Sequence, residues 1–358
     1  MKKKIIFFMS NLGGGGAERV TVNIIRQLDK EKYEIVLLMV KREGTFLADI
    51  PSYVKIENMN IDKTILSLFK VRKYIKLYQP DIIYTTMMMN SIVLSLAIMH
   101  LKKSFFIVIR NPTSPKILEE EGTLPLYKKL LLVYAYRHCA DIILAQTPEM
   151  KDEIEKYYSV SKQKIEVFFN PLDREGIDSK IKNIKNPFSE DTINIVSAGR
   201  LTYAKAFDTL LYAFKKVITE NKNYRLHILG EDDGESKKIF EIFKKLHLEE
   251  YVTFHGFQSN PYQFFYFSDL YVLSSRREGL PNAVLENLYL GKPVVATNCI
   301  SFMNQLIDEN NNGYIVEVDN ILMLSQAILN FKLLPNNKKV IRSKSVTTFF
   351  DTFEKSSL

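Results

Sequence analysis

The feature that most constrains the fold is a regular alternation of short apolar runs and longer amphipathic segments. Runs such as 33–40 (YEIVLLMV) and 81–86 (DIIYTT) are largely apolar throughout, whereas segment 17–29 carries apolar residues at helical spacing. Continuous apolar strands are typical of parallel strands that helices bury on both faces. The alternation therefore predicts an α/β fold made of doubly wound, Rossmann-like parallel sheets.

The alternation is interrupted once, which indicates two domains. Segment 171–191 (PLDREGIDSKIKNIKNPFSED) is polar, contains two prolines and shows no apolar period. We therefore expect an N-terminal domain over 1–170, a linker over 171–191, a C-terminal domain over 192–335 and a helical tail over 336–358. Doubly wound sheets bind ligands at the carboxyl ends of their strands, so a ligand cleft is expected between the domains.

Several protein classes are disfavoured by simple counts. The two cysteines, Cys139 and Cys299, lie far apart, which is typical of a reduced compartment and not of a disulfide framework. The first apolar run, 5–9, is shorter than the core of a signal peptide, and no apolar stretch approaches the ~20 residues that span a bilayer. We therefore expect a cytoplasmic protein that is neither secreted nor membrane-spanning.

The positive charge is concentrated in the first half of the chain. Residues 1–170 contain 26 Lys and Arg against 18 Asp and Glu, whereas residues 171–358 contain 23 of each. This asymmetry predicts an anionic partner for the N-terminal half, namely lipid head groups, a phosphorylated substrate or nucleic acid. Nucleic acid ranks low because the sequence has no RNP-like or zinc-finger pattern.

Two segments of that half interleave basic and apolar residues. Segment 64–78 contains Lys70, Arg72, Lys73 and Lys76 among leucine, isoleucine and phenylalanine, and segment 124–137 contains two lysines among leucine and tyrosine. One interpretation is docking of the N-terminal domain on the inner face of an anionic membrane, with a lipid-linked acceptor. The alternative is that both are ordinary amphipathic helices packed on the sheet with solvated lysines.

A run of four glycines follows the first expected strand. In "NLGGGGAERV" (11–20), Gly13 to Gly16 separate that strand from a helix, so backbone N–H groups there could approach an anion at the helix N-terminus. Neither the dinucleotide pattern G-x-G-x-x-G nor the Walker pattern fits. The loop therefore indicates a general site of close approach, and the alternative is a tight turn with spare glycine.

The second half contains a candidate diphosphate site. In "SAGRLTYAKAFDTLLYAF" (197–214), Arg200 follows an expected strand and Lys205 precedes an expected helix. Two cations near a helix N-terminus are suited to a diphosphate. A solvated basic loop is the alternative for this stretch alone.

Two carboxylates follow in "SSRREGLPNAVLENLYLGKPVVAT" (274–297). Glu278 comes after an expected strand, and Glu286 lies in the next helix with seven residues between them. A carboxylate at a strand end can accept hydrogen bonds from sugar hydroxyls, and one on the adjoining helix can bind the vicinal hydroxyls of a ribose. The alternative is a pair of surface glutamates.

Taken together, these segments resemble the family 4 glycosyltransferases, which are retaining enzymes of GT-B fold. The resemblance rests on the E-x7-E block and on the order of the other motifs, which are "GGAERV" (15–20), "AGRLTYAKAFDTLLYAF" (198–214), "LHILGE" (226–231), "VTFHGF" (252–257) and "NNGYIV" (311–316). The GGAERV opening, "RNP" (110–112) and "FFNPLD" (168–173) resemble the subgroup that builds bacterial capsule, O-antigen and related glycans.

The resemblance implies a role for each candidate residue. It implies catalytic roles for Arg200, Lys205 and Glu278, with the two cations neutralising the leaving diphosphate and Glu278 lying near the donor sugar. It implies that Glu286 binds ribose and that the backbone around Phe257 faces the base. The full set of donor-binding candidates is Gly15, Gly16, Arg200, Lys205, Gly230, Phe257, Glu278, Gly279, Leu280 and Glu286.

The implied activity is transfer of a hexose or N-acetylhexosamine from a nucleotide sugar, with UDP expected and GDP-mannose as runner-up. The implied acceptor is a glycan or lipid-linked saccharide. No metal and no cofactor beyond the nucleotide-sugar co-substrate are expected, because the cationic side chains stabilise the diphosphate charge.

The sequence departs from the family after the strand at 293–297. Relatives often have a glycine-bearing loop that ends in Glu, but here the chain reads Ser301, Phe302, Met303, Asn304 and Gln305. We expect Phe302 and Met303 to crowd the donor. This departure motivates the alternative of a non-catalytic GT-B partner or scaffold, while a nucleotide-sugar epimerase ranks lower still. Lys205 is also followed by Ala206, where relatives usually have Gly.

Overall fold

The chain forms two compact units. The computed structural model describes residues 2–120, 122, 124–189, 191–232, 234–335 and 345–353. The first unit contains residues 1–173 and 343–358, and the second contains residues 174–342. The expected two-domain organisation therefore corresponds to two units that divide after Asp173, and the C-terminal segment returns to the first unit.

The first unit is built on a sheet whose described strand pairs are all parallel. Its strands lie in the order β3 (Lys55–Asn58), β2 (Tyr33–Met39), β1 (Lys3–Met9), β4 (Ile82–Thr86), β5 (Phe106–Arg110), β6 (Ile142–Ala145) and β7 (Ile165–Val167). The order reverses between β1 and β4, which is the switch point of a doubly wound sheet. The predicted parallel architecture is confirmed here.

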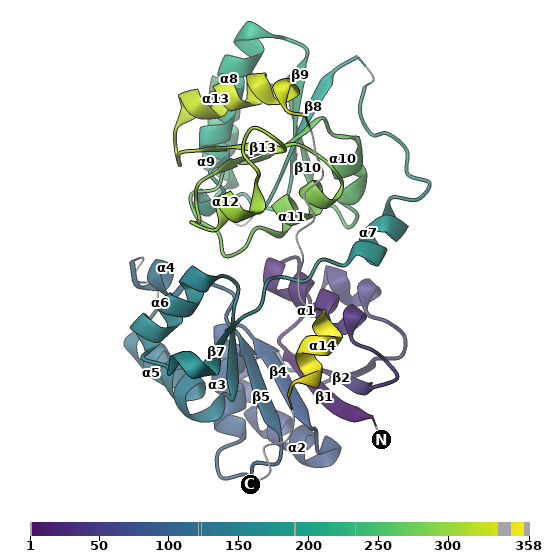
Figure 1. Cartoon of the computed structure of the whole chain (residues 1–358), viewed down its shortest axis with the longest axis vertical. Helices are drawn as coiled ribbons and strands as arrows, with labels where there is room; N and C mark the ends of the chain where they lie inside the picture. The colour runs from purple at the N-terminus through teal and green to yellow at the C-terminus, as the bar shows by residue number, and fades with distance from the viewer. Residues whose placement is uncertain are drawn as a thin grey trace. The chain divides into compact units, whose positions relative to one another are not determined.

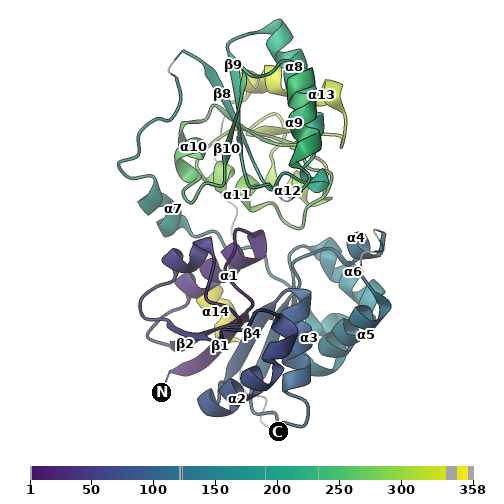
Figure 2. The ribbon, with the colours of Figure 1, turned by 180° about the vertical axis from the view of Figure 1, so that it is seen from behind.

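Helices cover both faces of this sheet. Their bounds are α1 (Gly16–Gln27), α2 (Leu68–Tyr78), α3 (Met88–Ala97), α4 (Pro115–Glu120), α5 (Leu126–Tyr134) and α6 (Pro148–Tyr158). Helices α3 and α5 lie on one side of the sheet, and α1 lies on the other beside the C-terminal helix α14 (Val346–Asp351) (Figures 1 and 2). Alternate residues of β1 contribute to separate cores on the two faces, with Ile6 and Phe8 on one and Phe7 and Met9 on the other.

The C-terminal segment packs on the face that α1 covers. Phe349 lies 4.4 Å from Phe168 between ring centroids, and Phe353 stacks on Phe106 at 4.9 Å. Asp351 accepts a hydrogen bond from the Tyr33 hydroxyl at 2.6 Å. A helical tail was expected over 336–358; residues 336–344 and 354–358 of that range lie outside the described residues.

The second unit repeats the same topology. Its parallel strands lie in the order β10 (Val252–Gly256), β9 (Tyr224–Leu229), β8 (Ile193–Ala198), β11 (Leu270–Leu273), β12 (Val294–Thr297) and β13 (Gly313–Val316). Its helices are α7 (Arg174–Lys180), α8 (Phe207–Glu220), α9 (Ser236–Lys245), α10 (Tyr262–Phe267), α11 (Asn282–Tyr289), α12 (Met303–Leu306) and α13 (Ile321–Asn330). Helices α8, α9 and α13 lie on the side of the sheet opposite α10 (Figures 1 and 2).

Among the described strands and α-helices, three were not predicted. Strand β3 is a short edge strand in which Lys55 and Asn58 are exposed and the two residues between them partly buried, so its sequence, KIEN, lacks the continuous apolar run of the inner strands. Helix α4 is a single short helix that begins at Pro115. Helix α7 lies inside the segment interpreted as a linker, where burial of Gly176 and Ile177 in the second unit replaces an apolar period. Among the described residues, no helix is both long enough and apolar enough to span a membrane.

Candidate functional site

The carboxyl edge of the second sheet brings the predicted donor residues together. Arg200, Gly230, Phe257 and Glu278 each follow the end of one of four neighbouring strands, β8, β9, β10 and β11. Parallel strands end at the same edge of a sheet, so these positions form one row beside the switch point between β8 and β11. The sequence predicted only the order of these residues along the chain, whereas the strand order shows that they lie along one edge of the sheet.

Lys205 and Glu278 form an ion pair within this row. The Lys205 ammonium donates to Glu278 Oε1 at 2.6 Å, and the Ser275 hydroxyl donates to the same oxygen at 2.7 Å. The side chains are 25% and 12% exposed, so the pair is partly shielded from water. The sequence analysis assigned these residues to different parts of a donor, whereas the structure couples them directly.

Glycines at the ends of β8 and β9 permit this arrangement. The Lys205 stem lies over Gly199, where an added Cβ would come within 2.9 Å of Lys205 Cδ and Cε. At Gly230, which has a φ of +154°, an added Cβ would lie 1.8 Å from the carbonyl oxygen of Gly199. Gly230 therefore has a packing role that only glycine can fill.

Ala206 occupies a backbone conformation that favours glycine. Its φ is +51° and its side chain is fully buried before α8. The left-handed conformation costs a non-glycine residue about 1–2 kcal/mol, which accounts for the glycine that relatives usually have here. The change from glycine is therefore accommodated at a local cost in backbone strain, and Lys205 stays in place.

Glu286 is buried and held by a tyrosine. The Glu286 residue is 6% exposed, and the hydroxyl of Tyr262 in α10 donates to its Oε1 at 3.1 Å. Sequence reasoning placed Glu286 correctly on a helix, α11, but missed Tyr262 and Ser275. A turn signal at Asn260–Pro261 predicts the start of α10, although it says nothing about the contact with Glu286.

The turn between β11 and α11 contains the remaining candidates of this unit. Gly279 is partly buried, and Leu280 is buried just before Pro281, the N-cap residue of α11. Cys299 lies close enough for Glu278 to affect it: burial raises the pKa of the Cys299 thiol to about 12, and the negative charge of Glu278 adds to this rise. Cys299 is therefore a neutral thiol at physiological pH and not an activated nucleophile.

Phe302 and Met303, which were expected to crowd the donor, are both buried residues. Phe302 is 5% exposed and Met303 is fully buried at the start of α12. Ser301, Asn304 and Gln305 are the exposed residues of this loop. The bulk of the loop is thus part of the core, which a one-dimensional comparison with glycine-bearing loops could not show.

In the first unit, the glycine run forms the turn between β1 and α1. Gly15 is the N-cap residue of α1 and Gly16 its first residue. An added Cβ at Gly15 would lie 2.5 Å from Glu18 Oε2, so the Glu18 carboxylate lies over the turn. A negative side chain in the first turn is favourable for the helix dipole.

The two other quoted motifs of the first unit contact each other. Arg110, at the end of β5, is 2% exposed and donates through Nη2 to Asn170 Oδ1 at 2.6 Å. Asn111 accepts a hydrogen bond from the Tyr136 hydroxyl at 2.9 Å. "RNP" and "FFNPLD" are therefore joined by buried polar contacts at the carboxyl edge of the first sheet.

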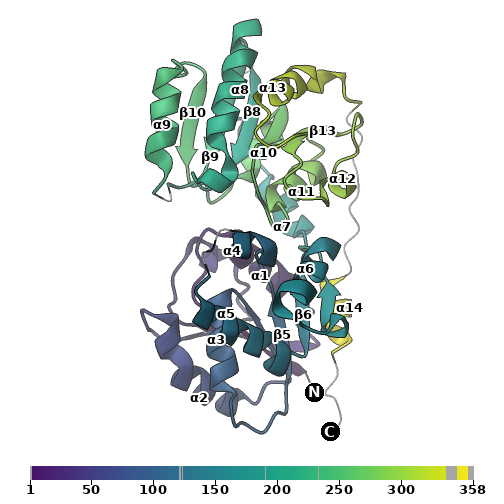
Figure 3. The ribbon, with the colours of Figure 1, turned by 90° about the vertical axis from the view of Figure 1, so that its left-hand side faces the viewer.

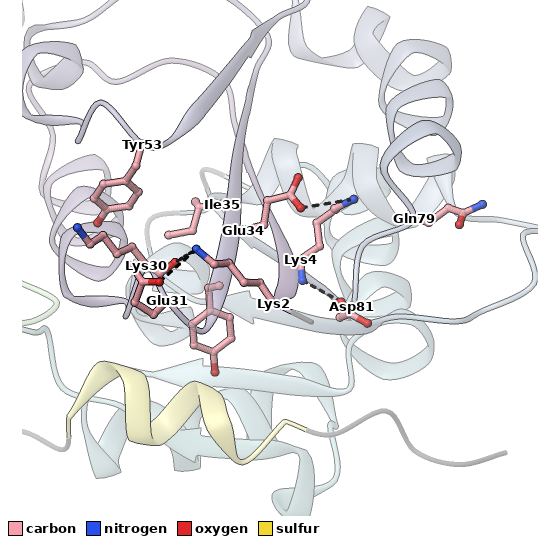
Figure 4. Close-up of a pocket in the computed structure, with 10 residues that line it drawn as sticks. Lys2, Lys4, Lys30, Glu31, Glu34, Ile35, Tyr53, Gln79 and Asp81 are labelled. Carbon is pink, nitrogen blue, oxygen red and sulfur yellow. Dashed lines mark hydrogen bonds and ion pairs between the residues drawn. The ribbon is translucent and has the colours of Figure 1, made fainter.

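A hollow of about 680 Å³ lies at the opposite, amino edge of the first sheet (Figure 4). Its lysines Lys2 and Lys4 pair with Glu31 at 3.7 Å and Glu34 at 3.8 Å. Doubly wound sheets bind ligands at the carboxyl ends of their strands, so this balanced, mixed-charge hollow is not the candidate site. The described residues contain no group of three or more His, Cys, Asp and Glu side chains arranged to hold a metal ion.

Two family models match the chain, one in each unit. The model described as Glycosyltransferase Family 4 matches residues 14–175, and the model described as Glycosyl transferases group 1 matches residues 178–345. Together they cover both units.

Individual relatives agree with the family models. An uncharacterized glycosyltransferase of Methanocaldococcus jannaschii is 33% identical over 76% of this chain and 66% of its own length. The N-acetylgalactosamine-N,N'-diacetylbacillosaminyl-diphospho-undecaprenol 4-alpha-N-acetylgalactosaminyltransferase of Campylobacter jejuni is 28% identical over 96% of this chain and 94% of its own length.

The fold is shared with solved structures. HepE from Anabaena, solved in complex with UDP-glucose, superposes with a TM-score of 0.74 at 18% identity, covering 97% of this chain and 94% of that chain. The two parallel-sheet units, each with the same strand order, are thus those of the GT-B fold. The chain belongs to the family 4 glycosyltransferases.

Proposed function

We propose that the protein is a retaining glycosyltransferase that moves a hexose or N-acetylhexosamine from a nucleotide sugar to a glycan or lipid-linked saccharide in surface polysaccharide assembly. The observation that carries the proposal is the Lys205–Glu278 ion pair in the row of strand ends that also contains Arg200. In the proposal, Lys205 is the cation for a leaving diphosphate and the adjacent Glu278 is the acid for a sugar hydroxyl. The first unit is assigned to the acceptor.

In this proposal the charged residues divide the donor between them. Arg200 and Lys205 stabilise the negative charge that develops on the departing diphosphate, which is the kind of electrostatic stabilisation that contributes most in many enzymes. Glu278 binds the transferred sugar, and Glu286 binds the ribose. Transfer occurs on the front face with retention, and no metal is required because the two cations supply the positive charge.

UDP is the proposed nucleotide. The support is indirect: HepE was solved with UDP-glucose, and the C. jejuni relative is named for transfer of N-acetylgalactosamine to a saccharide on diphospho-undecaprenol. The same relative supports a lipid-linked acceptor. The non-catalytic alternative is based on loop 301–305, in which Phe302 and Met303 are buried.

The function is tested by the thermal stability of the protein with UDP, GDP and ADP. We expect UDP to raise the melting temperature, because a ligand that binds only the folded state stabilises it by about 2.7 kcal/mol at one hundred times its Kd. Glu286→Ala should abolish most of this rise. A rise with GDP alone would replace the proposed nucleotide, and no rise with any of the three would contradict the function.

We further propose that the first unit docks on an anionic membrane through the outer faces of α2 and α5, which both contact α3 (Figure 3). The outer face of α2 and the turn before it exposes Leu66 (65%), Phe69 (80%) and Leu77 (65%). That of α5 exposes Leu126 (71%), Tyr127 (62%) and Leu130 (61%). Exposed apolar side chains next to lysines suit a lipid interface.

The structure divides the four basic residues of α2 into two kinds. Arg72 donates to the carbonyl oxygens of Ala97 and Met99, and Lys70 donates to that of Met59, so both are engaged in the fold. Lys73 and Lys76 are exposed on the same helix face as Phe69. The lipid-binding charge is therefore assigned to Lys73 and Lys76.

Lys73→Gln with Lys76→Gln should weaken binding to vesicles that contain anionic lipid. Each lysine near an anionic surface contributes about 1 kcal/mol, so the pair predicts a loss of roughly thirtyfold in the partition coefficient. Co-sedimentation at low salt measures it, with Lys237→Gln and Lys238→Gln on the exposed face of α9 as the control. Parent protein that ignores anionic vesicles, or a control that loses as much binding, would contradict docking through α2.

A further inference from the structure

Arg276 stands out because each of its five guanidinium N–H groups has an acceptor inside the second unit. Nε donates to Asp319 Oδ2 at 2.9 Å, and Nη2 donates to the Thr209 hydroxyl at 3.2 Å and lies 2.9 Å from Asp319 Oδ1 in an ion pair. Nη1 and Nη2 donate to the two oxygens of Asp208 at 3.0 and 2.9 Å, and Nη1 also donates to the carbonyl oxygen of Tyr203 at 2.9 Å. Because its N–H groups are occupied and its side chain is only 13% exposed, Arg276 is not placed to bind a nucleotide sugar itself.

Arg276 also contacts the loop that carries Lys205. Three successive carbonyl oxygens of this loop accept hydrogen bonds from the end of β11. The Tyr203 carbonyl accepts from the Arg276 guanidinium, that of Ala204 from the Arg276 backbone N–H at 2.8 Å, and that of Lys205 from the Ser274 hydroxyl at 2.9 Å. The guanidinium also lies 4.2 Å from the centroid of the Tyr203 ring.

The same short segment leads to Glu278. Arg276 therefore fixes the loop before α8 to the segment that carries the acid, and the Lys205–Glu278 pair at 2.6 Å spans these two connected parts. The two carboxylates anchor the guanidinium from the first turn of α8 and from the residues after β13. Bidentate pairs of this kind hold both position and orientation.

We propose that Arg276 is a positioning residue for glycosyl transfer: it holds Lys205 where the diphosphate of the donor is bound. This inference rests on the proposed function, since it assigns the diphosphate to Lys205. Displacement of a binding group by about 1 Å can cost on the order of a hundredfold in activity. Loss of the Arg276 contacts should therefore weaken binding of the diphosphate and not of the nucleoside. Glu286 is held separately by Tyr262 and is unaffected.

The test compares nucleotides with and without the second phosphate. Isothermal calorimetry measures the Kd of UDP and UMP, and of GDP and GMP, for the parent, Arg276→Ala and Arg276→Lys. We expect Arg276→Ala to weaken UDP about tenfold to a hundredfold and UMP less than threefold, by the positioning argument. Arg276→Lys, which retains the charge without the planar guanidinium, should have a Kd for UDP between those of the parent and Arg276→Ala. It replaces Arg276→Ala in the test if that variant does not fold.

Arg225 offers a matched control in the same unit. It lies at the start of β9, donates to the carbonyl oxygens of Lys222 and Tyr224, and lies 5.0 Å from the Tyr251 ring centroid. Arg225→Ala should leave the Kd of UDP and of UMP unchanged. In addition, Arg276→Ala made in a Lys205→Ala background should change UDP affinity less than threefold, because residues that act as a unit are not additive.

The outcomes distinguish failure of the Arg276 inference from failure of the proposed glycosyltransferase function. Equal losses of UDP and UMP affinity would make Arg276 a structural residue only and overturn the inference. UDP binding by Arg276→Ala at the parent Kd, or a full loss that persists in the Lys205→Ala background, would overturn it as well while leaving the glycosyltransferase function intact. A parent protein that binds neither UDP nor GDP overturns the proposed function and this inference with it.

Discussion

Replacing Lys205 with alanine is expected to lower kcat/KM for the true donor by about 100- to 1,000-fold, by analogy with removal of one oxyanion-hole donor. The Lys205 side chain lies at the carboxyl edge of the second sheet. Its methylene groups pack over Gly199, and its ammonium pairs with the Glu278 carboxylate. Removing it takes away a cation that stabilises the leaving diphosphate. Arg200→Ala should act in the same direction, because Arg200 follows the neighbouring end of β8.

The measurement is steady-state release of UDP from the donor, with thermal unfolding as the check on the fold. Lys216→Ala is the control, since Lys216 is an exposed lysine on α8 away from its N-terminal end. The Lys205 variant leaves the Glu278 carboxylate without its cation, so a modest fall in melting temperature is expected as well. Turnover at the parent rate in a folded Lys205→Ala variant would remove Lys205 from the site.

The sequence predicted most of the fold because inner parallel strands have a local signature. Strands such as β1 and β2 contain runs of five apolar residues, and the apolar residues of the helices recur about every 3.6 residues. Both patterns can be recognised without knowledge of contacts. The edge strand β3 and the short helix α7 lack those signatures. Their stability comes from neighbours distant in sequence, which local patterns do not encode.

The site was predicted as a set of residues and only partly as a set of contacts. Arg200, Glu278 and Glu286 were found because their types and spacing match a known family. The Lys205–Glu278 pair and the Tyr262–Glu286 hydrogen bond join elements 73 and 24 residues apart. Such pairs depend on strand order and on side-chain direction, and the sequence alone specifies neither.

The loop after β12 shows why side-chain direction matters. Phe302 and Met303 were interpreted as bulk directed at the donor, because relatives have small residues there. In the structure they are 5% and 0% exposed and form part of the second unit's interior, while their neighbours Asn304 and Gln305 face solvent. Whether a side chain of this loop is buried or exposed therefore cannot be read from its residue type and position alone.

Restoring small residues in this loop, Phe302→Gly with Met303→Pro, is accordingly expected to destabilise the second unit instead of widening donor range. Truncating a buried Phe or Met typically costs about 3–5 and 2–5 kcal/mol, respectively. Proline at 303 also removes the hydrogen bond from the Met303 backbone N–H to the Ile300 carbonyl oxygen, which measures 3.1 Å. The sum is comparable with the about 5–15 kcal/mol by which a whole domain is stable.

Thermal and urea unfolding of the full chain measure this loss. We expect the double variant to lose the cooperative unfolding of the second unit, and with it UDP binding. Phe302→Leu, a milder change, should lower the free energy of unfolding by about 1–2 kcal/mol, since it removes part of a buried ring while keeping an apolar side chain. Asn304→Ala with Gln305→Ala, on the exposed side of the same helix, should change it by less than about 0.5 kcal/mol. A double variant that melts at the parent temperature and accepts a wider range of sugar donors would show that Phe302 and Met303 face the donor after all.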